Sequence, residues 1–221
     1  MDNVLNRVAE RKEELKLAVN LATKKDAQEH RQRLAKYKQK LSDYNERRDL
    51  AQAMIRKSPE AIRTVLVEHS DLGDLIQIGP EPSISVTAKS IYANITVSPA
   101  SIVPSHQKVL LKSGKLSSKQ MPKSLYYEIY KAYVCGAAIR AAREIFAAVP
   151  EYTAVVSVYC KQLNPKSGHL ETLPILSVTF VYDTLQQLNI DHVDPSACLD
   201  NFIHELNFSR TRGFSPLPKH S

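Results

Sequence analysis

The sequence predicts an α+β fold in which a long N-terminal helical arm, with coiled-coil character, precedes a mostly antiparallel sheet packed on one long helix. The arm is predicted because residues 3–57 contain neither proline nor glycine and are rich in residues of high helix propensity. The sheet is predicted because two runs of β-branched and aromatic residues flank a turn cluster, Asn164 to Gly168, as in a β-hairpin. The expected units are a helical arm at residues 1–57, a short linking helix at 58–70 and an α+β globular domain at 71–221.

The arm carries a narrow apolar seam of residues that recur seven apart, as in helices that pair in coiled coils. The seam changes phase between Thr23 and His30, so the arm is either a helical hairpin with a turn there or one helix with a local stutter. Because so narrow a seam is not stable alone in water, we expect it to pack against a second copy or against a helix of another protein. The seam residues are Val8, Leu15, Ala22, Leu34, Tyr37, Leu41 and Tyr44.

The net charge of +7 is concentrated in the arm, because residues 1–57 hold 15 Lys and Arg against 9 Asp and Glu. A basic helix of this kind is either a solvated face or a surface that attracts the phosphates of nucleic acid. The second interpretation gives a set of candidate nucleic-acid-binding residues, which are Lys24, Lys25, Arg31, Arg33, Lys36, Lys38 and Lys40.

Between the arm and the hairpin, signals for a helix start and for strands follow one another. Ser58 and Pro59 combine a capping residue with a proline at the first helical position, which predicts the short linking helix. Residues 84–97 alternate apolar and polar side chains, which predicts two strands with one buried face. Residues 113–122 are polar and basic, which predicts an exposed loop.

Two further helices are predicted in the globular domain. Residues 124–149 place apolar side chains three and four apart, with small residues in the middle, so Gly136 should face the sheet at close approach. Asp194 and Pro195 repeat the combination of a cap and a proline, and residues 199–206 would give a last helix its apolar face.

The sequence holds few candidates for catalysis or metal binding. A nuclease site would require Glu151, Lys161 and Asp183 to converge from the hairpin, and Cys160 with His169 would have to act as nucleophile and base across it. The three cysteines are far apart and lie in apolar segments, so we expect them to be reduced and buried. We predict no catalytic residue, no metal and no cofactor, because the spacing of Asp191, His192, Asp194, Cys198 and His204 matches no zinc or calcium motif.

The order of elements in the globular domain resembles the C-terminal module of some bacterial proteins of uncharacterised function. The similarity covers a small-residue helix ending in Ile145-Phe146, the turn from Leu163 to His169, the strand at residues 175–178, and the segments Leu188-Asn189 and Val193-Asp194-Pro195. Such modules occur with helical arms, and some lie near restriction or phage-defence genes. The resemblance implies a bacterial cytoplasmic binding module and assigns no catalytic residue.

Taken with the arm, these observations predict a non-enzymatic bacterial interaction protein that self-associates through its helical arm and serves as an accessory subunit at nucleic acid. The alternative is an enzyme, such as a nuclease, with an unrecognised site. The expected partners are a second copy or another helical protein, with nucleic acid as a further partner. Because no apolar run is long enough to span a membrane and no secretory signal is present, we expect a cytoplasmic protein without a membrane partner.

Overall fold

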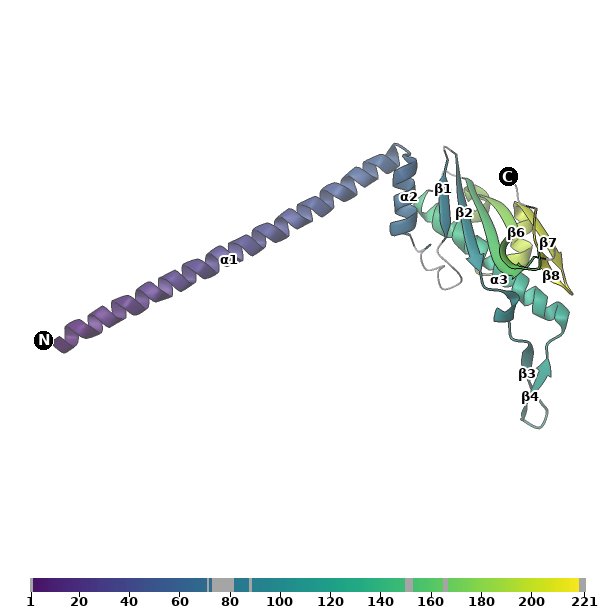
Figure 1. The fold of residues 1–221 in the computed structure, drawn as a ribbon, viewed down its shortest axis with the longest axis horizontal. Coiled ribbons are helices and arrows are strands. Elements are labelled where there is room, and N and C mark those ends of the chain that lie inside the picture. Colours follow the sequence, from purple (N-terminus) through teal and green to yellow (C-terminus); the bar gives the residue numbers. More distant parts are fainter. Residues whose placement is uncertain are drawn as a thin grey trace. The chain divides into compact units, whose positions relative to one another are not determined.

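The computed structural model describes residues 2–70, 72, 82–87, 89–149, 153–164 and 167–218. Contacts within the chain divide it into two compact units, Met1–Arg56 and Lys57–Ser221 (Figure 1). Among the described residues, no helix combines the length and the apolar character that crossing a bilayer requires.

The first unit is a single helix, α1 (Asp2–Ile55), of 54 residues. The helical-hairpin alternative is therefore wrong, and the change of seam phase falls within a continuous helix. At 1.5 Å per residue the helix is roughly 80 Å long. It ends where Lys57 adopts a left-handed conformation with φ of 57°, and the amide of Arg56 donates to the carbonyl of Gln52.

The second unit begins with α2 (Pro59–Glu68), a short helix within the range 58–70 for which the sequence predicted one. The side chain of Ser58 accepts a hydrogen bond from the amide of Ala61, as the capping signal predicted. Ile62 and Leu66 are buried, and α2 packs against the first strand and the long helix of this unit.

A six-stranded sheet forms the centre of the second unit, in the order β1-β2-β5-β6-β7-β8 (Figure 1). All its pairings are antiparallel except that between β2 and β5, so the predicted mostly antiparallel α+β architecture is confirmed. The hairpin predicted around residues 164–168 is the β5–β6 pair. The strands are β1 (Ser83–Val86), β2 (Ser90–Val97), β5 (Thr153–Leu163), β6 (Leu170–Val181), β7 (Ile203–Ser209) and β8 (Gly213–Ser215).

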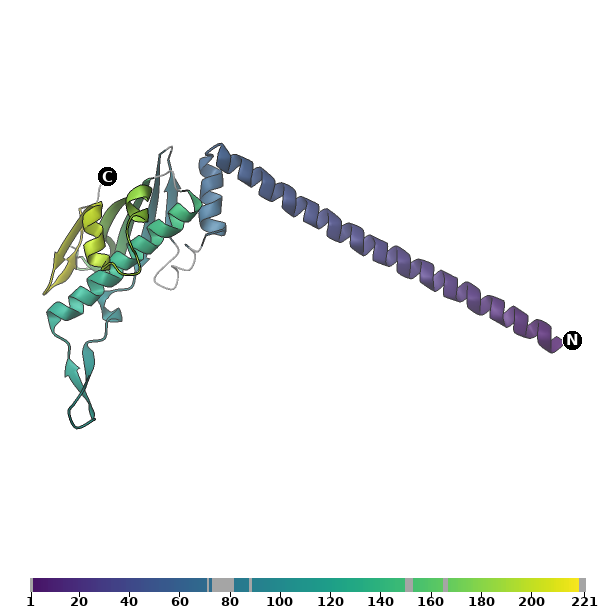
Figure 2. The same cartoon turned by 180° about the vertical axis from the view of Figure 1, so that it is seen from behind.

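One face of this sheet is covered by α3 (Lys123–Ala148), which matches the long helix that the sequence predicted (Figure 2). Alternate residues of β5, such as Val156 and Val158, are fully buried, as are Val134 and Ala138 of α3. The alternate buried residues of the strands and the apolar face of α3 therefore pack together in one core. Because α3 lies between β2 and β5 in the chain, it is the crossover that makes their parallel pairing possible.

Two predictions for the second unit are wrong about element type. The predicted loop at 113–122 contains a strand, because β3 (His106–Leu110) and β4 (Leu116–Gln120) form a separate exposed hairpin. The predicted last helix stops early: α5 (Pro195–Cys198) and a 3-10 turn (Leu199–Asn201) lead directly into β7. A further short helix, α4 (Tyr182–Gln186), follows β6.

The predicted packing of Gly136 is also wrong. A Cβ atom built on Gly136 would have as its nearest neighbour the Cβ of Pro195, at 4.0 Å. Gly136 therefore faces α5 rather than the sheet, and the contact leaves room for a methyl group. The residues of α3 that do reach the core lie on a neighbouring face and include Tyr130 and Ile145.

Candidate functional site

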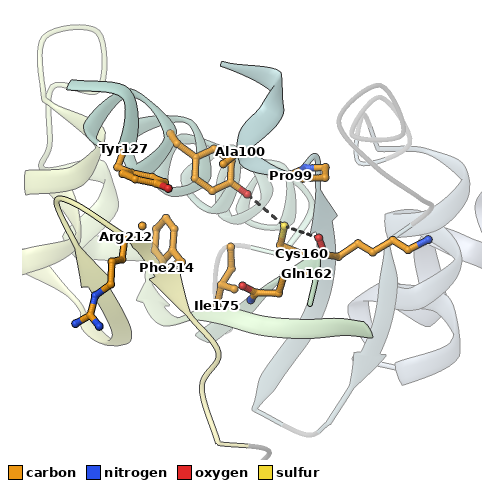
Figure 3. Close-up of a pocket in the computed structure, with 11 residues that line it drawn as sticks. Pro99, Ala100, Tyr127, Cys160, Gln162, Ile175, Arg212 and Phe214 are labelled. Carbon is orange, nitrogen blue, oxygen red and sulfur yellow. Dashed lines mark hydrogen bonds between the residues drawn. The ribbon is translucent and has the colours of Figure 1, made fainter. Parts of the chain in front are cut away.

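A cavity of about 160 Å³ lies between the N-terminal half of α3, the end of β5 and β8 (Figure 3). Its volume is about that of a cavity that holds one benzene ring. Aromatic and aliphatic side chains form most of the wall, among them Tyr127, Ile175 and Phe214. The polar lining residues are Tyr130, Cys160, Lys161, Gln162 and Arg212.

A close approach between β8 and α3 closes one side of the cavity. Gly213 has φ of 78°, and a Cβ atom at this position would come within 2.7 Å of the ring of Tyr127. Both the backbone conformation and the lack of space therefore require glycine. Phe214 follows, and its ring meets that of Tyr130 edge to face, with 5.9 Å between centroids.

A β-bulge shapes the opposite side of the cavity. Val158 of β5 pairs with Leu176, whereas Tyr159 pairs with Pro174, so Ile175 is left without a partner in the ladder. Ile175 lines the cavity. Pro174 lacks an amide proton, and its position beside the bulge is one of the few that a sheet interior allows. Its carbonyl accepts from the amide of Leu217, which ties the C-terminal segment to the sheet.

The hydroxyl of Tyr130 and the thiol of Cys160 lie next to each other, with 3.3 Å between Oη and Sγ (Figure 3). The tyrosine hydroxyl also donates to the carbonyl of Ser98, at 2.9 Å. Burial raises the pKa of the Cys160 thiol, and the hydrogen bond with Tyr130 opposes part of that increase. Burial likewise raises the pKa of Tyr130. Both groups are therefore neutral at pH 7, so Cys160 lacks the thiolate that a nucleophile needs.

Gln162 supplies the one orphaned polar atom among the described side chains, because its Nε2 is buried without a hydrogen-bond partner. An unsatisfied buried donor costs about 1 to 3 kcal/mol. Gln162 lines the cavity beside Cys160, and the exposed Arg212 stands at its margin (Figure 3). The cavity is thus large enough for a small ring, and no His, Asp or Glu is among the described residues that line it.

The candidate catalytic and metal-binding residues do not come together in the described part of the chain. Cys160 pairs with Leu173 across the hairpin, whereas His169 is exposed beside the turn. Lys161 and Asp183 are exposed, and Glu151 lies outside the described residues. The described residues contain no cluster of three or more His, Cys, Asp or Glu that could hold a metal ion. Asp194 instead caps α5 by accepting from the amides of Ser196 and Ala197, and Cys135, Cys160 and Cys198 are free and buried, as expected.

The second candidate site is the surface of α1, where the predicted seam residues have large exposed side chains. Leu34 and Leu41 are 44% and 45% exposed, and Tyr37 and Tyr44 are 62% and 63% exposed. Leu15 and Ala22 are exposed as well, and the side chain of Val8 lies outside the described part. Large apolar side chains are therefore exposed along α1, and contiguous exposed apolar surface is a common feature of interaction sites.

The predicted nucleic-acid-binding residues lie on the same helix, and all seven are exposed. Arg33 is paired with Glu29, at 3.4 Å. Arg31, Lys38 and Lys40 make no ion pair with any described residue, so their charges are available to a partner. A separate group of exposed cations, which includes Lys108, Lys112, Lys115 and Lys119, lies on the β3–β4 hairpin.

Sequence reasoning missed the cavity because its residues come from five separate segments of the chain. One signal was present: four tyrosines fall within the first turns of α3, and a buried tyrosine needs a hydrogen-bond partner. Three of them bond the backbone of one segment: Tyr126 donates to the carbonyl of Ala100, Tyr130 donates to that of Ser98, and the hydroxyl of Tyr133 accepts from the amide of Ser98. In comparisons with known proteins, no family model matches the chain and no curated protein matches it.

Proposed function

We propose that this protein is a non-enzymatic interaction protein and that α1 is its binding arm. The observation that supports the proposal best is the exposure of Leu34, Tyr37, Leu41 and Tyr44 on one helix. Burying a leucine or a comparable side chain contributes about 1.5 to 3 kcal/mol, so covering these four would stabilise a complex substantially.

An isolated helix of this composition lacks the tertiary packing from which most helical stability comes. The apolar face of α1 provides a surface on which a partner would supply that packing. The cavity beside Cys160 supports an enzymatic function less well, because its thiol and phenol are neutral and no His, Asp or Glu is among the described residues that line it.

The test is to place a charge in the seam and measure association. Leu34→Asp with Leu41→Asp should abolish self-association or the binding of a helical partner, whereas Gln32→Asp with Gln39→Asp, on another face of the same turns, should leave it intact. Light scattering of the full chain, alone and with helical peptides or nucleic acid, provides the readout. If the wild-type chain is monomeric and binds none of these molecules, α1 is not a binding arm.

Nucleic acid is a second candidate for the same arm, and the unpaired Arg31, Lys38 and Lys40 favour it. For this candidate, the protein is an accessory subunit that binds nucleic acid through its phosphates. Contacts of this kind release counterions, so the affinity would fall steeply with salt. The seam leucines would not contact nucleic acid. Substituting them would therefore distinguish this candidate from helix pairing.

A further inference from the structure

The C-terminal half of α1 carries a regular stripe of heptad positions. Starting at Ala27, steps of three and four residues alternate up to Ile55 and pass through Leu34, Tyr37, Leu41 and Tyr44. In coiled-coil notation these are the a and d positions, which meet the partner helix, and the e and g positions flank them on either side. Because α1 is continuous over this range, the stripe is uninterrupted and winds slowly about the helix, by about 20° per heptad.

The flanks of this stripe are basic. The e positions include Arg31 and Lys38, and the g positions include Arg33, Lys40 and Arg47. Between residues 31 and 47 no e or g position holds an acid. All five cations are exposed, and among the described side chains of α1 Arg33 alone of the five is paired with a neighbouring acid. The apolar stripe is therefore bordered by positive charge on both sides.

This arrangement disfavours a second copy as the partner. In a parallel pair a g residue faces the e residue five positions later on the other helix, so Arg33 would face Lys38. In an antiparallel pair e faces e and g faces g, so cations again oppose cations. Arg48 occupies an a position, and a parallel pair would bring two of these side chains together within the seam.

Nucleic acid would pair with the cations of this surface but would not cover its apolar side chains. Phosphates would neutralise Arg31, Lys38 and Lys40, but they would leave Leu34 and Leu41 exposed to water. A helix with apolar a and d residues and acidic e and g residues covers the leucines and pairs the cations at the same time. It also places an acid within reach of Arg48.

We infer that α1 binds an acidic amphipathic helix of a different protein, with the stripe from Ala27 to Ile55 as the contact surface. The inference rests on the proposed function, since it names the partner of the same arm. The apolar a and d positions supply affinity, and the cationic e and g positions select the partner by the sign of its charge.

The probe is a synthetic peptide of about four heptads with Ile at a, Leu at d and Glu at e and g, and its control carries Lys at e and g. Fluorescence anisotropy with the full chain at about 150 mM salt should show binding of the Glu peptide at least tenfold tighter than of the Lys peptide. Arg31→Gln with Lys38→Gln should weaken Glu-peptide binding by at least about threefold. Gln32→Glu with Gln39→Glu, which changes the net charge equally at f positions, should leave it within about twofold.

Equal binding of both peptides, or an equal loss in both pairs of variants, overturns the acidic-helix inference while leaving α1 as a binding arm. Tighter binding of a DNA duplex than of the Glu peptide assigns the cations to nucleic acid and overturns the inference in favour of that partner. Dissociation of a stable homodimer by the seam variants overturns it in favour of a second copy. The proposed function fails as well if α1 binds none of the probes, that is, neither peptide, no duplex or single-stranded DNA, and no second copy.

Discussion

Gly213 lies against the ring of Tyr127 so closely that a Cβ atom at position 213 would approach Cδ1 of the tyrosine to 2.7 Å. This contact joins the short strand β8 to the first turns of α3, and it forms one wall of the cavity. Position 213 therefore requires glycine for two reasons, which are the lack of space for a Cβ atom and the positive φ.

Gly213→Ala should lower the free energy of unfolding by more than Gly114→Ala, which is its matched control. Both glycines have positive φ, at 78° and 75°, but Gly114 has no atom within 4 Å of a built Cβ. The strained conformation costs about 1 to 2 kcal/mol at either position, and overpacking against Tyr127 should add about 1 to 3 kcal/mol at 213 only. Urea denaturation measures both; equal losses would show that the Tyr127 ring moves aside freely.

Gly136→Ala should stabilise the protein. The Cβ of Pro195 would lie 4.0 Å away, which is an ordinary contact. Replacing a glycine in a helix interior by alanine gains about 0.5 to 1 kcal/mol. The midpoint of urea denaturation should rise; a lower midpoint would mean that α5 packs more tightly on α3 than the structure shows.

The β5–β6 hairpin, α2 and α3 could be predicted from sequence because each has a strong local pattern. β7 could not, because Leu199, Phe202 and Leu206 also fit helical spacing, and its strand character depends on pairing with β6. The polar residues of β4 gave no strand pattern, since this hairpin has no buried face. The parallel pairing of β2 with β5 depends on long-range packing that no local pattern contains.

The two candidate sites also differ in how far the sequence alone predicts them. The seam and the cations of α1 are a periodic property of one segment, so sequence was enough to find them. The cavity required the approach of Gly213 to Tyr127 and the bulge at Ile175, both of which follow from tertiary structure. That the cations border the stripe on both sides could be recognised only from the structure, because it depends on α1 being one helix rather than two.

Stability should fall as the pH rises from 9.0, and Cys135 should account for part of the decrease. Burial raises the pKa of this thiol from 9.0 to about 11. The unfolded chain therefore loses the thiol proton at lower pH than the folded chain does, and above pH 9 unfolding becomes more favourable. In urea titrations between pH 8 and about 11, Cys135→Ala should show a shallower decline, by about 1 to 2 kcal/mol. An unchanged slope would show that the thiol does not contribute.

If nucleic acid binds the arm, the logarithm of its affinity should fall linearly with the logarithm of salt, by about 0.9 for each phosphate neutralised on a duplex. Replacing Arg31, Arg33, Lys36 and Lys40 by glutamine should then flatten the slope. The matched control replaces the same number of exposed lysines on the β3–β4 hairpin, which are Lys108, Lys112, Lys115 and Lys119. A slope that responds only to the hairpin variant would move the nucleic-acid site away from α1.

The most direct test of α1 as an arm that binds an acidic helix is hydrogen exchange along the full chain, with and without the Glu peptide. Alone, the amides of α1 should exchange quickly and those of the β5–β6 core slowly, because only the core is packed. Adding the peptide should slow exchange within residues 27–55 and leave 57–218 unchanged. Unchanged exchange in α1, or new protection confined to the second unit, would contradict the account.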